Sequence, residues 1–159
     1  MDANKPRAWV RIVDDTGPRW PVYAATLEWD TPAKFDAIYN GDSCGGQGHC
    51  VRIAVTQNID QPCLQYGGFA VLIKNVNNNH LSDATYVRFN SRCAQLQFSD
   101  RDRRALACEE IGHVIGLDHA ASSLYQETCM ASGPIDRLHH KPWGHDFNMI
   151  DNVIYDHND

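Results

Sequence analysis

Four residues with carboxylate or imidazole side chains lie close together in the last third of this 159-residue chain: Glu109, Glu110, His113 and His119. Glu109 and His113 are four residues apart, so in a helix they share nearly the same face, one turn apart. Gly116 permits a left-handed turn at the end of such a helix, after which His119 can return to the same point. Glu109, His113 and His119 are therefore three candidate ligands for one metal ion, with Glu110 beside them.

The residues from Ser99 onward have the features of a helix that would carry this cluster. Ser99 can cap its N-terminus with Asp102 in a capping-box position, and Asp100 adds negative charge at the positive end of the helix dipole. Apolar side chains at roughly helical spacing predict the buried stripe. These are Leu106, Ile111 and Val114, with Ala105 and Ala107 between them.

Two histidines and one glutamate form an established catalytic zinc site, whose fourth position holds water. The charge of Glu109 should raise the pKa of that water relative to three neutral imidazoles. We expect one of the adjacent carboxyls, Glu109 or Glu110, to have a raised pKa without metal, and metal affinity to fall at acid pH. Cys108 is excluded as a ligand in place of Glu109, since it lies about 140° around the helix from His113.

The eleven residues 109–119, E-E-I-G-H-V-I-G-L-D-H, resemble the zinc-protease signature of the metzincins, H-E-x-x-H-x-x-G-x-x-H. Glu109 stands where that family has its first histidine. Downstream, Cys129 and Met130 resemble the Met-turn, and the ending L-D-H resembles the matrixin branch and secreted actinobacterial-type proteases. Ser132 stands where some metzincins have a tyrosine ligand. The four matching signature positions are Glu110, His113, Gly116 and His119.

The resemblance implies a secreted endopeptidase that acts on protein or peptide substrates with one catalytic zinc ion (Zn2+). Its ligands would be Glu109, His113 and His119, and Glu110 would be the catalytic general base. Met130 would form an apolar floor beneath the imidazoles, with a core methionine as the alternative. A segment resembling the strand that rims the substrate cleft would bind an extended peptide by strand addition, with a plain edge strand as the alternative. Its residues are Gly68, Phe69 and Ala70.

Two other functions stay open. The departure at Glu109 allows a metzincin-like protein that has lost its protease chemistry, by nature or by engineering, and acts as a binding module. A two-histidine, one-carboxylate set is also the facial triad of Fe(II) oxygenases, although no cosubstrate motif is visible. Retention of Glu110, Gly116, His119 and Met130 favours the peptidase, because a decayed site would have little reason to keep its base.

The order of expected elements predicts an α+β fold with one domain over residues 1–159. This order fits the metzincin-like zincin fold: a twisted mixed β-sheet backed by two helices in an upper subdomain of about residues 1–116, and a smaller lower subdomain of about 117–159 with the Met-turn and one C-terminal helix. The C-terminal helix should bury Phe147, Ile150, Val153 and Ile154. Strands are expected at 9–13, 35–39, 50–56, 68–74 and 85–89, and helices at 20–30, from 99 onward and at 145–155.

The composition is that of an ordinary globular domain, with 43% hydrophobic residues, 21% charged residues and a net charge of -6. No basic patch suggests nucleic acid, and no run of 18 apolar residues suggests a membrane helix. No loop carries the D-x-[DN]-x-[DN]-G pattern, which leaves calcium binding undecided. We expect a monomer. The first residues, Met-Asp-Ala-Asn-Lys, are not a signal peptide, so we expect a mature form with an added initiator Met.

Six cysteines, an even number, predict disulfides and an oxidising compartment. The lack of a C-x-x-C pair weighs against cysteine metal ligands. In terms of the resemblance, Cys108 precedes the metal motif and Cys129 precedes Met130, so a bridge between them would pin the Met-turn under the site. Of fifteen possible connectivities, the expected one is Cys44–Cys50 around a glycine-rich loop, Cys63–Cys93 and Cys108–Cys129.

Overall fold

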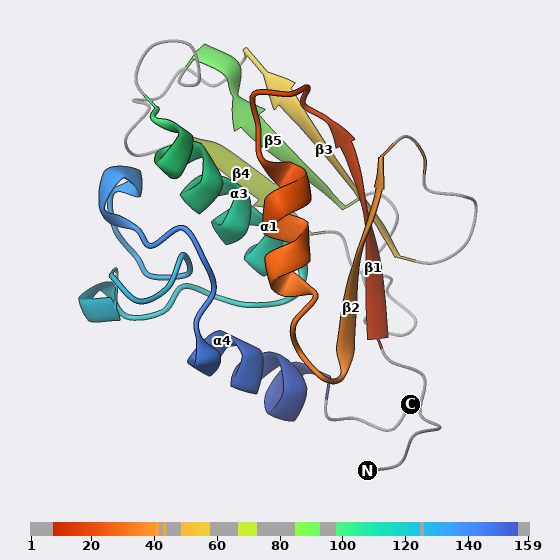
Figure 1. Cartoon of the computed structure of the whole chain (residues 1–159), viewed down its shortest axis with the longest axis vertical. Coiled ribbons are helices and arrows are strands. Elements are labelled where there is room, and N and C mark those ends of the chain that lie inside the picture. The colour runs from red at the N-terminus through yellow and green to blue at the C-terminus, as the bar shows by residue number, and fades with distance from the viewer. Residues whose placement is uncertain are drawn as a thin grey trace.

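The computed structural model describes residues 8–41, 43, 49–57, 67–72, 85–92, 98–124 and 126–155. Five strands form one mixed sheet in the order β2-β1-β3-β5-β4 (Figure 1). Neighbouring strands are parallel except β4, which runs antiparallel to β5. The coarse α+β class and the mixed sheet are as predicted. The strands are β1 (Ala8–Asp15), β2 (Phe35–Gly41), β3 (Cys50–Thr56), β4 (Gly68–Val71) and β5 (Tyr86–Asn90).

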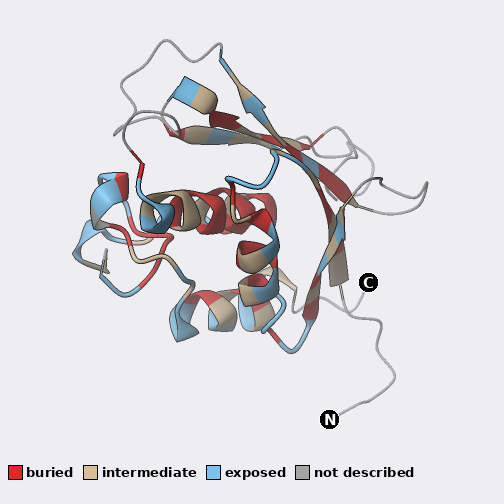
Figure 2. Cartoon of the chain, turned by 45° about the horizontal axis from the view of Figure 1, so that its top comes forward, coloured by how far each residue is buried: buried red, intermediate tan, exposed pale blue. Residues whose placement is uncertain are grey.

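Two helices cover one face of this sheet, α1 (Val22–Trp29) and α3 (Asp100–Val114) (Figure 1). Buried residues lie on the facing sides of the sheet and the helices (Figure 2). In the described part of the chain, no helix is long and apolar enough to cross a bilayer. The fully buried side chains that fill this layer include Ile12, Trp29, Phe35, Ile53, Phe89, Leu106 and Ile111.

The predicted strands and first helix are present with small shifts at their ends. Helix α1 begins at Val22 rather than at residue 20, because Pro21 occupies the N-cap position with a non-helical backbone. Strand β4 ends at Val71, and Leu72 has no strand pairing, so the predicted strand 68–74 is shorter by at least that residue. Residues 73–74 lie outside the described part.

Helix α3 begins as the sequence predicts. The Ser99 hydroxyl accepts a hydrogen bond from the backbone N–H of Asp102, and the Asp102 carboxylate accepts one from the backbone N–H of Ser99. This reciprocal capping box satisfies two N–H groups that the helix itself cannot. The predicted stripe of Leu106, Ile111 and Val114 is buried. Helix α3 therefore has a fixed start and a fixed face against the sheet.

The chain after α3 contains two short 3-10 turns, η1 (Ser122–Leu124) and η2 (Ile135–Arg137), then α4 (Gly144–Met149) and a π-helical turn, η3 (Ile150–Ile154). The prediction of one α-helix at 145–155 is wrong in its second half. The backbone N–H of Tyr155 bonds to the carbonyl of Ile150, five residues back. This wider turn breaks the 3.6-residue period, so Val153 is 61% exposed instead of buried.

The C-terminal segment is fastened to two distant parts of the fold. The Tyr155 hydroxyl donates a hydrogen bond to the carbonyl of Ile115, at the end of α3, over 3.0 Å. The Asp151 carboxylate accepts hydrogen bonds from the backbone N–H groups of Ala33 and Lys34, between α1 and β2, over 3.0 and 2.8 Å. These contacts connect the C-terminal segment with the end of α3 and with the chain between α1 and β2.

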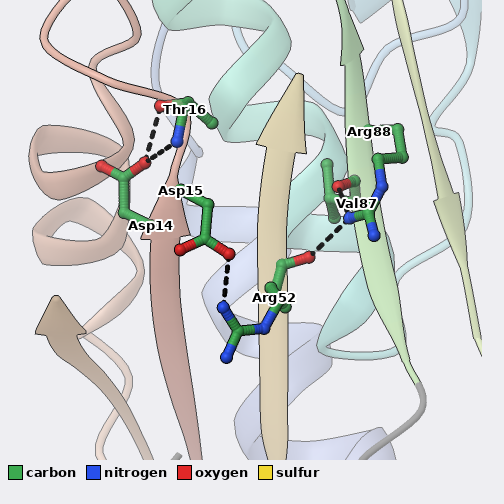
Figure 3. A network of polar contacts seen from close by, with 6 residues as sticks. All are labelled: Asp14, Asp15, Thr16, Arg52, Val87 and Arg88. Atoms are coloured by element: carbon green, nitrogen blue, oxygen red, sulfur yellow. Dashed lines mark hydrogen bonds and ion pairs between the residues drawn. The ribbon is translucent and has the colours of Figure 1, made fainter. Parts of the chain in front are cut away.

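The strands also carry polar contacts away from the helices. Arg52 on β3 forms an ion pair with Asp15 on β1, and the Arg88 guanidinium on β5 donates to the carbonyls of Arg52 and Val87 over 3.3 and 2.9 Å (Figure 3). The Arg52 side chain is 46% exposed. Exposed ion pairs of this kind contribute about 0–1 kcal/mol to stability. The backbone hydrogen bonds between the strands and the buried core therefore stabilise the sheet far more.

Candidate metal centre

Three side chains that the sequence predicts as metal ligands meet at one point. The Nε2 atom of His119 lies 3.1 Å from Oε1 of Glu109 and 3.2 Å from Nε2 of His113. One ligand atom from each of the three lies within 4.8 Å of the others. Glu109 and His113 come from successive turns of α3, and His119 comes from the chain beyond Gly116. The predicted convergence is confirmed.

The spacing of these donors fits a small divalent cation. Ligands held tetrahedrally at about 2.0–2.1 Å from zinc would lie about 3.3 Å apart. Two of the three separations, 3.1 and 3.2 Å, are close to that value, and the third, between Glu109 and His113, is within 4.8 Å. Two imidazole nitrogens and one carboxylate oxygen also suit zinc and Fe(II), whereas calcium prefers oxygen ligands only. The residues therefore form a possible metal-binding triad.

The end of α3 fixes the orientation of His113. Gly116 adopts φ +104°, and the N–H groups of Gly116 and Leu117 bond to the carbonyls of His113 and Gly112, both over 3.0 Å, which is a Schellman cap. This cap places the Leu117 carbonyl 2.9 Å from Nδ1 of His113. Because a carbonyl only accepts, Nδ1 must carry the hydrogen. Nε2 of the neutral ring is then free to act as a ligand.

A hydrogen bond joins Nε2 of His119 and Oε1 of Glu109 over 3.1 Å. His119 has 45% of its side chain exposed, whereas Glu109 has 13%. The hydrogen bond to Glu109 raises the pKa of His119 above its ordinary value, and burial only partly opposes this effect. When His119 is protonated, it therefore places a positive charge against the Glu109 carboxylate.

Glu110 lies on the buried side of the same turn of α3. It is 5% exposed. Burial raises the pKa of its carboxyl well above the ordinary value, and the neighbouring charge of Glu109 raises it further. This confirms the prediction that one of the two adjacent carboxyls is shifted upward. In the metal-free protein, Glu110 holds its proton more tightly than an exposed glutamate does.

Strand β4 passes directly beside Glu110. A Cβ atom built on Gly68 would lie 3.2 Å from Oε1 of Glu110, so the absence of a side chain allows the close approach. Among the described strands, β4 is at one edge of the sheet. Phe69 is 39% exposed there, and Ala70 is half-buried. The predicted substrate segment of Gly68, Phe69 and Ala70 is thus an edge strand next to the predicted base.

The predicted disulfide between Cys108 and Cys129 is present, with a Cα–Cα distance of 6.0 Å. It removes Cys108 as a possible ligand and attaches the residue before Glu109 to the residue before Met130. Cys50 is also disulfide-bonded. Its predicted partner, Cys44, lies outside the described residues, as does the predicted pair Cys63–Cys93.

Met130 is 1% exposed and packs beneath α3. A Cβ atom on Gly112, the residue before His113, would lie 2.2 Å from the Met130 sulfur and 2.8 Å from Cζ2 of Trp29. The indole N–H of Trp29 donates to the carbonyl of Cys108 over 2.9 Å. Gly112 therefore lets Met130 and Trp29 support the turn of α3 that carries the ligands. Ser132, at the position of the tyrosine ligand in some metzincins, is exposed.

Two buried polar residues near Met130 were missed by sequence reasoning. Thr128 is fully buried and Asp146, in α4, is 3% exposed. The Thr128 hydroxyl donates to Oδ2 of Asp146 over 2.6 Å. The only sequence signal is that Asp146 lies in the first turn of a predicted helix, which is common for a capping acid and says nothing of Thr128.

A scan against protein-family models found no match to this chain, and a search of curated proteins found none either. The functional argument therefore depends on the side chains of the site.

Proposed function

We propose that this protein is a secreted, zinc-dependent endopeptidase of the metzincin type. The observation that carries the proposal is the convergence of Glu109, His113 and His119 within 4.8 Å, with the buried Glu110 following Glu109 in α3. The disulfide Cys108–Cys129 supports an oxidising compartment, as expected for secretion.

Three ligands with a fourth position left for water are typical of catalytic rather than structural zinc sites. Glu109, His113 and His119 would hold the ion through Oε1 and the two Nε2 atoms. When bound, zinc supplies Lewis-acid polarisation of a carbonyl and a lowered pKa for water. The hydrogen bond from Nδ1 of His113 to Leu117 supports this role, because ligand histidines commonly donate their second N–H to a carbonyl.

Glu110 would act as the general base. One of its carboxylate oxygens would take a proton from the attacking water while the water oxygen bonds to the scissile carbonyl carbon and the C=O π electrons move to the carbonyl oxygen. The carboxyl would then give that proton to the amine nitrogen as the C=O bond reforms and the C–N bond breaks. Burial raises the pKa of Glu110 above its ordinary value, which is the direction in which enzymes shift a glutamate that acts as a general base.

Strand β4 is the best-supported site for the substrate backbone. An extended peptide that paired with the edge of β4 that no described strand covers would add a strand to the sheet. Gly68 brings this edge against Glu110, so residues bound alongside Phe69 and Ala70 would extend away from the base. A substrate chain of several residues in extended form is the ligand class that such an edge accepts.

The test combines elemental analysis with a casein digest. We expect about one zinc per chain, and proteolysis that a chelator abolishes and added zinc restores. The variant Glu110→Gln should keep its zinc and lose about 10²–10⁴-fold in rate, because it retains the ligands but not the base. Zinc-loaded protein without proteolysis would contradict the peptidase, and proteolysis that survives Glu110→Gln would contradict the role of Glu110 as the base.

A second candidate is a binding module that has lost its chemistry, because Glu109 stands where the metzincin signature has its first histidine. If the protein is such a binding module, we expect elemental analysis to find no metal and casein to stay intact. Iron in place of zinc would instead support the Fe(II) enzyme, because two histidines and one carboxylate also form its facial triad.

A further inference from the structure

The segment Thr128–Ala131 contacts the chain next to each of the three candidate ligands. Cys129 is bonded to Cys108, the residue before Glu109. The Met130 sulfur packs against Gly112, the residue before His113.

The third contact is made through the backbone. The carbonyl of Met130 accepts a hydrogen bond from the N–H of Ala120, the residue after His119, over 2.7 Å. Ala120 and Ala131 also form an isolated parallel bridge, and Ser132 N–H donates back to the Ala120 carbonyl over 3.0 Å. One short segment therefore touches both stretches of chain that supply ligands, through a covalent bond, a packing contact and a backbone pairing.

This segment is itself held by a buried polar chain that begins in α4. Oδ2 of Asp146 accepts hydrogen bonds from the Thr128 hydroxyl over 2.6 Å and from the Trp143 N–H over 2.7 Å. The Thr128 oxygen accepts a further bond from the Met130 N–H over 3.0 Å. A carboxylate that is 3% exposed is costly to bury unless it is well bonded, so these contacts determine where the segment lies.

We propose that Thr128 and Asp146 are positioning residues for the metal centre, which act on all three ligands through the segment Thr128–Ala131. This inference rests on the proposed metal-binding function. The competing explanation is that Asp146 only caps the first turn of α4. The bond to Trp143 N–H serves that cap, whereas the bond to the Thr128 hydroxyl does not, so the two roles can be separated at Thr128.

The test is the affinity of the full chain for zinc, measured by competition with a chelating dye. Thr128→Val keeps the shape of the side chain and the cap of α4 but removes the hydroxyl. We expect it to weaken zinc binding about 10-fold, the lower end for residues that orient metal ligands. Thr128→Ser keeps the hydroxyl and should restore the wild-type affinity.

Thr26→Val is a matched control. Thr26 is also fully buried, and its hydroxyl donates to the Val22 carbonyl over 2.9 Å, a bond within α1 and not to the segment Thr128–Ala131. It should lose stability without losing zinc affinity. Unchanged affinity in Thr128→Val, or an equal loss in Thr26→Val, would overturn the positioning role while the metal centre stands. If the wild-type chain binds no zinc, the proposed function and this inference both fail.

Discussion

Removal of the disulfide Cys108–Cys129 should destabilise the protein by an amount that can be worked out in advance. The bridge joins residues 21 apart in sequence. For a loop of that length the chain-entropy relation gives about 3 kcal/mol, because the unfolded chain regains its freedom. Both cysteines are fully buried, so replacement by alanine adds a packing loss of the same sign. In a domain of this size we expect the Tm to fall by about 6–12 °C.

The assay is urea unfolding of Cys108→Ala/Cys129→Ala against the wild type, with a chelator present so that metal binding does not add to stability. The same pair compared in reducing agent isolates the packing loss, because neither protein then has the bridge. A difference below about 1 kcal/mol under oxidising conditions would refute the reasoning. It would mean that the unfolded chain already holds the two cysteines close together.

Three further predictions concern the site. Glu109→His should raise both zinc affinity and casein hydrolysis, since three neutral imidazoles leave more positive charge on the ion. Dye competition measures the affinity and a casein digest measures the hydrolysis. A drop in both would show that the carboxylate is the better ligand. When a chelator keeps metal from binding, the raised pKa of Glu110 means that ionisation of its carboxyl opposes folding. The penalty is absent below its ordinary pKa of 4.5 and grows as pH rises through the folded value. Glu110→Gln should therefore be more stable than wild type at pH 7 by urea unfolding. Equal stability at that pH would contradict the raised pKa of Glu110. Gly116→Ala should cost about 1–3 kcal/mol in urea unfolding, because φ is +104°. Gly144→Ala, where a Cβ meets nothing within 4 Å, should be nearly neutral, and equal effects would contradict the strain argument.

Helix α3 and its ligands were predictable because the signals are local. Ser99 and Asp102 cap the helix, Gly116 ends it, and the spacing of Glu109 and His113 sets their common face. Local hydrogen-bond geometry determines each of these features, and none of them depends on contacts between distant segments.

What could not be predicted depends on contacts between distant segments. Thr128 and Asp146 are 18 residues apart, and neither side chain is unusual in its local sequence. The approach of Gly68 to Glu110 depends on β4 joining the edge of the sheet beside β5, which no periodicity encodes. The π turn that exposes Val153 likewise departs from the helical period on which the buried stripe was predicted.

The bond between Tyr155 and Ile115 affects how the protein can be shortened for crystallisation. Ile115 lies between His113 and Gly116, so the phenol supports the turn that aims the first imidazole. Trimming the chain back to Met149 would leave that carbonyl without its donor and the backbone of Ala33 and Lys34 without the Asp151 carboxylate. A truncated version that retains the whole ligand motif would still have a loosened ligand turn, so the minimal unit for structural work extends through Tyr155.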